Sequence, residues 1–227
     1  MNHCPTVSRR SFLQSVSAGA LIAAVANVAL VRPALALTTL TPDAALKRMM
    51  DGNARYAAER LEAFNEDLAI LRADTEEKQE PFASVLSCAD SRVPVEIVFD
   101  QSIGHLFVAR VAGNVATAEV IASLEYGVAV LGTAIIMVLG HGHCGALKAA
   151  IAGKEAPGQI SALYAPLRPA IDEAGPNLEA AIRANAKIQA KLLSQASPVL
   201  AGFIAQGRLK VVAAYYDLIS AKVELLG

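Results

Sequence analysis

Short apolar runs alternate with stretches of helical periodicity along most of this chain, and that alternation restricts the folds open to it. The runs end in polar or glycine-rich turns and occupy residues 82–88, 105–114, 134–145 and 208–218. Between them, residues 116–132 and 177–196 have the spacing of helices. Apolar strands that alternate with helices are typical of a mostly parallel sheet covered on both faces. The sequence therefore predicts an α/β fold with a central sheet of four to five strands flanked by helices, in which residues 221–226 form the fifth strand at an edge.

A helix is predicted before the first strand. Thr41 is a favourable N-cap and Pro42 a favourable first helical residue. Gly52 is typical of a helix end, although the helical pattern resumes in residues 54–64. The polar residues 66–81 are expected to lead into the first buried strand.

Residues 1–36 have the three parts of an export signal. The twin arginine Arg9–Arg10 is followed by an apolar run at 15–31 and by "ALA" at 34–36, which fits the A-x-A cleavage pattern. The run is near the short limit for a bilayer span, so a retained membrane anchor is the alternative. We expect a cleaved signal at 1–36, a single catalytic domain at 37–227, and export of the folded chain to the periplasm by the twin-arginine machinery.

Cys88 and Cys144 are the cysteines that remain after residue 36, and two chemistries suit them. A disulfide is the first expectation in an oxidising compartment. Metal ligation is the other, because Cys88 ends one predicted strand and His141 and Cys144 lie in the turn after another. Sites in open α/β sheets form where parallel strands end, so these residues can meet there. Two thiolates and an imidazole are a zinc set that leaves a fourth position open, which is the catalytic arrangement.

His143 is a rival ligand in the same turn. It is adjacent to Cys144, whereas His141 is three residues away and can close on one ion with Cys144 more easily. We therefore favour His141.

In "SCADSRVPVE", Asp90 and Arg92 alternate with Cys88, so strand spacing would turn all three side chains to the same side.

These motifs resemble those of the β-class carbonic anhydrases. "CADSR" at 88–92 and "GHGHCG" at 140–145 match a Cys-x-Asp-Ser-Arg stretch and a later Gly-His-x-x-Cys-Gly turn of that family, and the likeness extends over about residues 42–220. The resemblance implies one Zn²⁺ per chain, held by Cys88, His141 and Cys144. It also implies a carbonate dehydratase, which converts carbon dioxide reversibly into bicarbonate and a proton.

The resemblance gives the catalytic roles to Asp90 and Arg92. Arg92 would hold Asp90 off the zinc, and Asp90 would orient the zinc-bound hydroxide that attacks carbon dioxide. In a closed form of some members the aspartate becomes the fourth ligand. His105 stands where many members have an acid, and it is interpreted as a surface residue, a structural partner or a proton shuttle.

Gln79, Phe107 and Tyr126 match residues that line the carbon dioxide pocket in one branch of the family. Some of these reach the site from a neighbouring subunit, which implies a homodimer or a tetramer. Residues 217–223 lack a glycine often found in the last turn, which puts the C-terminal hairpin in doubt. The formal net charge of −1 gives no electrostatic footprint for nucleic acid.

Two alternatives use the same residues. One is a zinc-binding or thiol redox protein on this fold without hydratase activity, which a Cys88–Cys144 disulfide would favour. The Asp90–Arg92 pair argues against it, since a structural zinc site needs no such pair. The other is a hydrolase of a related small substrate, such as carbon disulfide or carbonyl sulfide.

Overall fold

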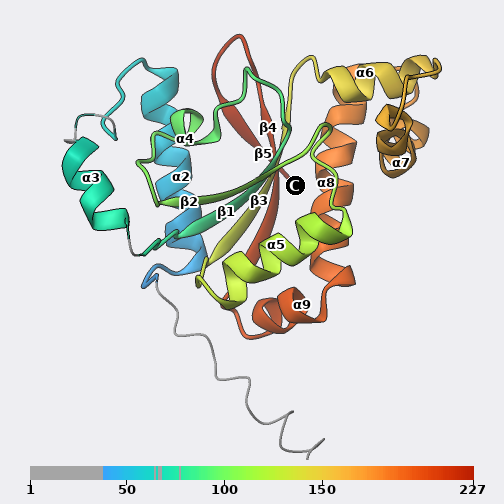
Figure 1. Cartoon of the computed structure of the whole chain (residues 1–227). Helices are drawn as coiled ribbons and strands as arrows, with labels where there is room; N and C mark the ends of the chain where they lie inside the picture. Colours follow the sequence, from blue (N-terminus) through green and yellow to red (C-terminus); the bar gives the residue numbers. More distant parts are fainter. Residues whose placement is uncertain (1–37, 64, 66–67, 77) are drawn as a thin grey trace, which may run out of the picture. The chain divides into compact units, whose positions relative to one another are not determined.

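The computed structural model describes residues 38–63, 65, 68–76 and 78–227. The predicted export signal lies outside these residues. Within them, no helix has both the length and the apolar character needed to cross a membrane. The elements labelled in Figure 1 are, in chain order, α2 (Pro42–Ala57), α3 (Leu68–Thr75), β1 (Ala83–Ser87), α4 (Val95–Val98), β2 (Leu106–Arg110), α5 (Ala118–Ala129), β3 (Ile135–His141), α6 (Gly145–Ala152), the 3₁₀ turn η1 (Ile160–Leu163), α7 (Tyr164–Ala174), α8 (Leu178–Ala196), α9 (Pro198–Ala205), β4 (Lys210–Tyr216) and β5 (Val223–Leu226).

The strands form one sheet in the order β2-β1-β3-β4-β5. The pairs β1–β2, β1–β3 and β3–β4 are parallel, and the edge strand β5 is antiparallel to β4. Every residue of β1 and β3 is buried, as expected for central strands of a parallel sheet with helices on both faces. The predicted α/β architecture, including the fifth strand at the edge, is confirmed.

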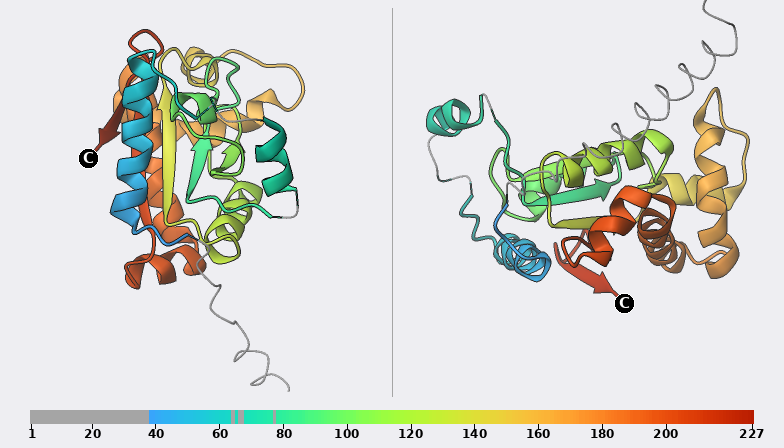
Figure 2. Two further views of the ribbon diagram at one scale, coloured as in Figure 1. Left: turned by 90° about the vertical axis from the view of Figure 1, so that its left-hand side faces the viewer. Right: turned by 90° about the horizontal axis from the view of Figure 1, so that it is seen from below.

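Alternate residues of the strands pack into different layers. Val85 belongs to a cluster with Met49 of α2 on one face of the sheet, whereas the next residue, Leu86, packs with Leu124 of α5 and Leu193 of α8 on the other. Figures 1 and 2 show α2 and α8 flanking the sheet from opposite sides. The strands therefore run in one direction between two helical layers, and the carboxyl ends of β1, β2, β3 and β4 meet at one edge.

Helix α2 begins as predicted, because the Thr41 hydroxyl accepts a hydrogen bond from the Ala44 N–H at 3.2 Å. The expected continuation past Asn53 is confirmed as far as Ala57, where α2 ends, whereas the expectation that Gly52 marks a helix end is wrong. An added Cβ at Gly52 would lie 1.9 Å from the carbonyl oxygen of Phe99. Glycine is thus required there for close packing against the segment after α4, not for termination.

Four short helices have weak sequence signals. Helix α3 lies inside the polar segment 66–81, and α4 is only four residues long, too short for periodicity to be visible. Helix α7 contains Pro169, which masks its helical pattern. Helix α9 does carry a start signal, because Pro198 follows Ser197, whose hydroxyl accepts from the Leu200 N–H at 3.0 Å.

The C-terminal hairpin forms although its turn lacks glycine. Ala221 takes a left-handed backbone conformation with φ 60°, which is unfavourable for a residue with a Cβ. The buried side chain of Asn53 offsets this, donating to the Ala221 carbonyl at 3.0 Å and accepting from the Val223 N–H at 2.8 Å. Helix α2 therefore fixes the entry into β5.

The Asp100→Asn variant is expected to be less stable by about 2 kcal/mol at pH 7, the scale of hydrogen bonds to charged groups. Asp100 is buried, which alone would raise its pKa, but the N–H groups of Ala63 and Glu62 and the guanidinium of Arg55 outweigh burial and lower that pKa. Since the native pKa lies below the unfolded value of about 3.9, this stabilisation is complete above that pH and is lost as the pH falls through the native pKa.

Urea unfolding of the zinc-free protein at pH 7 and pH 3 checks this expectation. The difference in unfolding free energy between wild type and variant should shrink at the lower pH. An equal difference at both pH values would contradict an ionised Asp100.

Candidate metal centre

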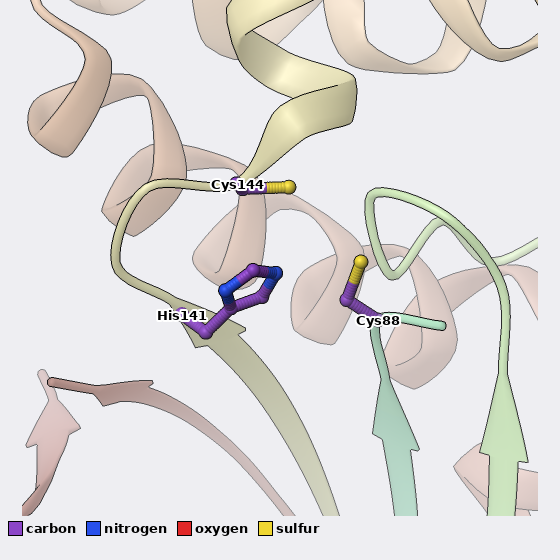
Figure 3. Close-up of side chains that lie close together, drawn as sticks. All are labelled: Cys88, His141 and Cys144. Atoms are coloured by element: carbon purple, nitrogen blue, oxygen red, sulfur yellow. The ribbon is translucent and has the colours of Figure 1, made fainter. Parts of the chain in front are cut away.

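Three side chains from three segments converge at the carboxyl edge of the sheet. Cys88 follows β1, His141 is the last residue of β3, and Cys144 is the N-cap of α6 (Figure 3). Their ligand atoms all lie within 4.8 Å of one another, and all three residues are buried. The topology thus brings together residues that are 53 positions apart in the chain, as the strand-end argument predicts.

The His141 ring is oriented for ligation. Its Nδ1 lies 2.9 Å from the Gly142 carbonyl oxygen and donates to it, which leaves a lone pair on Nε2. Nε2 is buried and has no hydrogen-bond partner in the described part of the chain. Because an unpaired buried nitrogen is costly, this atom fits a metal ligand whose other nitrogen fixes the tautomer.

The two cysteine sulfurs also have the surroundings of ligands. The Cys88 Sγ accepts a hydrogen bond from the Gly113 N–H at 3.3 Å. The neighbouring Cys144 thiol lowers the pKa of Cys88, against the effect of burial. The proximity of Cys88, together with burial, raises the pKa of Cys144. Both cysteines are free thiols, so no disulfide joins them.

The donor set therefore fits Zn²⁺. Two sulfurs and one imidazole nitrogen are soft-to-borderline ligands that zinc takes in tetrahedral sites, and three protein ligands are the number found at catalytic zinc. His143 lies outside this group, because its side chain is exposed and its backbone is in the left-handed region with φ 56°. The turn therefore places His141 in the cluster and His143 at the surface.

Asp90 and Arg92 form a bidentate pair beside the cluster. Arg92 Nε donates to Asp90 Oδ1 at 2.9 Å, and Nη2 donates to Oδ2 at 2.8 Å. These hydrogen bonds hold the pKa of Asp90 well below its usual range, so the carboxylate is ionised. Oδ2 lies 3.9 Å from His141 Nε2, next to the ligand atoms.

Gln79, Phe107 and Tyr126 lie together, but not on the cysteine cluster of the same chain. The rings of Phe107 and Tyr126 are 6.2 Å apart, and Gln79 lines a surface hollow with Tyr126. Phe107 pairs in register with Ser84 of β1. Cys88 lies four residues further along the chain than Ser84, so Phe107 is separated from the level of Cys88 by about 13 Å along the strand direction. A single chain does not place these side chains at its own metal centre.

His105 lies at the opposite end of β2 from the cluster. Its Nδ1 is 3.2 Å from Arg48 Nη2, and its ring packs against Phe82. Among the three interpretations of His105, these contacts support a structural partner.

The sequence analysis missed Arg110. This residue ends β2 and pairs in register with Ser87. Its Nε donates to the Cys88 carbonyl at 2.9 Å and its Nη2 to the Asp90 carbonyl at 2.6 Å. Arg110 thus fixes the backbone of the segment that carries the candidate metal ligand Cys88 and the carboxylate of Asp90. The available sequence signal was an arginine at the end of an otherwise apolar predicted strand. This strand follows the one that ends at Cys88.

Replacing Arg110 by Lys is expected to lower kcat/KM about 10-fold, the lower end of the range for groups that support metal ligands. Lysine keeps the charge but cannot donate to two carbonyls in a fixed fork. Steady-state hydration assays on zinc-loaded protein check this. Arg168→Lys is the matched control, because Arg168 is exposed on α7 and pairs with its helix neighbour Asp172, away from the cysteine cluster. Equal activity of both variants would contradict the assigned role.

Together, the fold and the site define an α/β protein with a buried group of two cysteines and one histidine that could hold a metal ion. The family model described as "Carbonic anhydrase" matches residues 83–223. The chain is 45% identical over 111 residues to Carbonic anhydrase 2 of Mycobacterium tuberculosis, an alignment that covers 49% of this chain and 53% of that protein. It is 33% identical over 195 residues to a carbonic anhydrase of Mycolicibacterium smegmatis, covering 81% of this chain and 93% of the relative.

A solved structure shows the same architecture. A tetrameric β-carbonic anhydrase of Sordaria macrospora superposes with a TM-score of 0.64 at 23% identity, over 80% of this chain and 96% of that chain. The chain belongs to the β-class carbonic anhydrase family.

Proposed function

We propose that this protein is a zinc-dependent enzyme for the reversible hydration of carbon dioxide to bicarbonate and a proton. The observation that carries the proposal is the buried His141 Nε2, which has no hydrogen-bond partner among the residues that the structure describes and lies close to two thiol sulfurs, with an ionised carboxylate 3.9 Å away. Zinc held by Cys88, His141 and Cys144 would supply a nucleophilic hydroxide near neutral pH.

Asp90 and Arg92 act on the attacking group in this proposal. An ionised carboxylate is an acceptor only, so Asp90 Oδ2 would accept a hydrogen bond from the hydroxyl group of the nucleophile and leave a lone pair of its oxygen free to face the carbon of the substrate. Arg92 uses both Nε and Nη2 on Asp90, which keeps the carboxylate ionised and in one orientation. Its Nη2 also lies 3.3 Å from the His143 carbonyl, so the pair is tied to the turn that carries His141.

A second subunit is the proposed source of the pocket walls. Tyr126 of α5 and Val130, which follows the end of α5, are 48% and 51% exposed. They line a surface hollow together with Gln79, Glu76 and Lys78, and the ring of Phe107 lies 6.2 Å from the Tyr126 ring. We infer that this surface contacts a second copy and that Gln79, Phe107 and Tyr126 line the partner's carbon dioxide pocket. The Sordaria macrospora relative is tetrameric, so a homodimer or a tetramer suits this chain.

Export is proposed from the sequence alone. The twin arginine and apolar run favour transport of the folded, zinc-loaded chain to the periplasm. Cell fractionation of the full chain and of an Arg9→Lys/Arg10→Lys variant tests it, and equal periplasmic amounts of the two would contradict it.

The other two functions are less well supported. The free thiols of Cys88 and Cys144 give no support to a disulfide redox protein. Carbon disulfide and carbonyl sulfide remain substrates to compare directly. Stopped-flow measurement of carbon dioxide hydration, with the consumption of both sulfur compounds measured on the same sample, should show fast hydration and slow or no sulfur chemistry. Fast hydrolysis of either sulfur compound without hydration would overturn the assignment.

A further inference from the structure

Helix α8 places two amide side chains in the interior of the protein. Asn185 is 0% exposed and Gln189 is 2% exposed, and they are one helical turn apart. Both face the loop that follows β2. Amides are rarely buried this fully unless their hydrogen bonds are satisfied, so their partners indicate what they do.

The two amides hold both ends of the loop segment 113–116. Asn185 Nδ2 donates to the Gly113 carbonyl at 2.9 Å, and Gln189 Oε1 accepts from the Ala116 N–H at 2.9 Å. Gln189 Nε2 donates to Asn185 Oδ1 at 3.2 Å, so each amide orients the other. It also lies 3.4 Å from the Pro166 carbonyl. The pair therefore acts as one hydrogen-bonded unit.

The first residue of this loop segment contacts a proposed metal ligand. Gly113 has φ +78°, and an added Cβ would lie 3.2 Å from the methyl groups of Leu167. Asn185 donates a hydrogen bond to the Gly113 carbonyl, and the Gly113 N–H donates to Cys88 Sγ at 3.3 Å. A shift of the loop would move that N–H away from the sulfur.

We propose that Asn185 and Gln189 are positioning residues for the metal centre. They fix the Gly113 N–H against Cys88 Sγ, and through it the direction of one sulfur ligand. A hydrogen bond to a ligand atom orients it and stabilises its ionised form, and the loss of such outer partners typically weakens metal binding 10- to 100-fold. This inference rests on the proposed function, because it needs the zinc site to be real.

Zinc release from the purified, zinc-loaded full chain tests the proposal. A colorimetric chelator measures the rate and the equilibrium affinity well below the unfolding temperature of each variant. Asn185→Ala and Gln189→Met are each expected to bind zinc about 10-fold more weakly than wild type. The double variant should lose less than the product of the two single effects, because both residues act through one loop. Should Asn185→Ala fail to fold, Gln189→Met alone decides the matter.

Leu193→Ala is the control for general destabilisation. Leu193 is buried on the same helix in a cluster with Leu86 and Leu124, and its apolar side chain makes no hydrogen bond to the loop, so the variant is expected to lower the unfolding temperature and keep wild-type zinc affinity. Wild-type zinc affinity in the folded amide variants would overturn the inference. A loss of zinc affinity in Leu193→Ala as large as that in the Asn185 and Gln189 variants would also overturn it. A wild type that takes up no zinc would overturn the proposed function itself.

Discussion

The His141→Asn variant is expected to bind zinc at least about 100-fold more weakly than wild type and to lose carbon dioxide hydration with it. The expected loss exceeds the usual effect of removing a group that only hydrogen-bonds to a metal ligand, because His141 itself supplies a ligand atom in the proposed site. Its Nε2 is buried, has no hydrogen-bond partner within the described part of the chain, and lies within 4.8 Å of both sulfurs. An asparagine amide is shorter and is a poor zinc ligand compared with imidazole or thiolate.

The same substitution two residues later is the matched control. His143 is exposed and adopts a left-handed backbone conformation, which asparagine tolerates well. His143→Asn should therefore keep zinc, activity and the backbone carbonyl that Arg92 contacts. Metal analysis and hydration assays on both variants decide the case. Zinc loss in His143→Asn with retention in His141→Asn would show that the turn presents the other histidine.

The Asp90→Asn variant is expected to lower kcat/KM by about 10²- to 10⁴-fold, the usual contribution of a positioned acid or base, with zinc content unchanged. The amide has nearly the same shape but places an NH₂ donor where an acceptor is needed. It also breaks one of the two parallel hydrogen bonds from Arg92. Stopped-flow hydration at saturating zinc measures this loss.

Glu96→Gln is the control for the loss of one negative charge nearby. Glu96 is exposed on α4, only six residues after Asp90, and has no place in the site. Its variant should keep wild-type kcat/KM. If Asp90→Asn were as active as Glu96→Gln, the carboxylate would have no part in the reaction.

The sequence was sufficient to predict that Cys88, His141 and Cys144 meet in one cluster, because they lie at or just after the ends of strands. Cys88 comes one residue after β1, and His141 is the last residue of β3, so a parallel sheet alone brings them to one edge. The choice between His141 and His143 also followed from local spacing. These predictions needed no knowledge of side-chain packing.

Residues that support the site could not be predicted in the same way. Arg110, Gly113 and Asn185 act through contacts between segments that are distant in sequence, and no local pattern specifies their partners. Gly52 was misassigned for a similar reason, since its role depends on the approach of Phe99. The placement of Phe107 and Tyr126 away from the cluster of their own chain reflects their position on β2 and on α5, and which of the pocket residues a neighbouring subunit would supply did not follow from the motifs.

Stepwise addition of zinc to the metal-free protein, with carbon dioxide hydration measured by stopped flow at each step, tests the central claim most directly. Activity should rise in proportion to bound zinc and level off at one equivalent per chain, the stoichiometry of a single Cys88–His141–Cys144 site. Full zinc occupancy without hydration, or hydration that persists without zinc, would contradict the account.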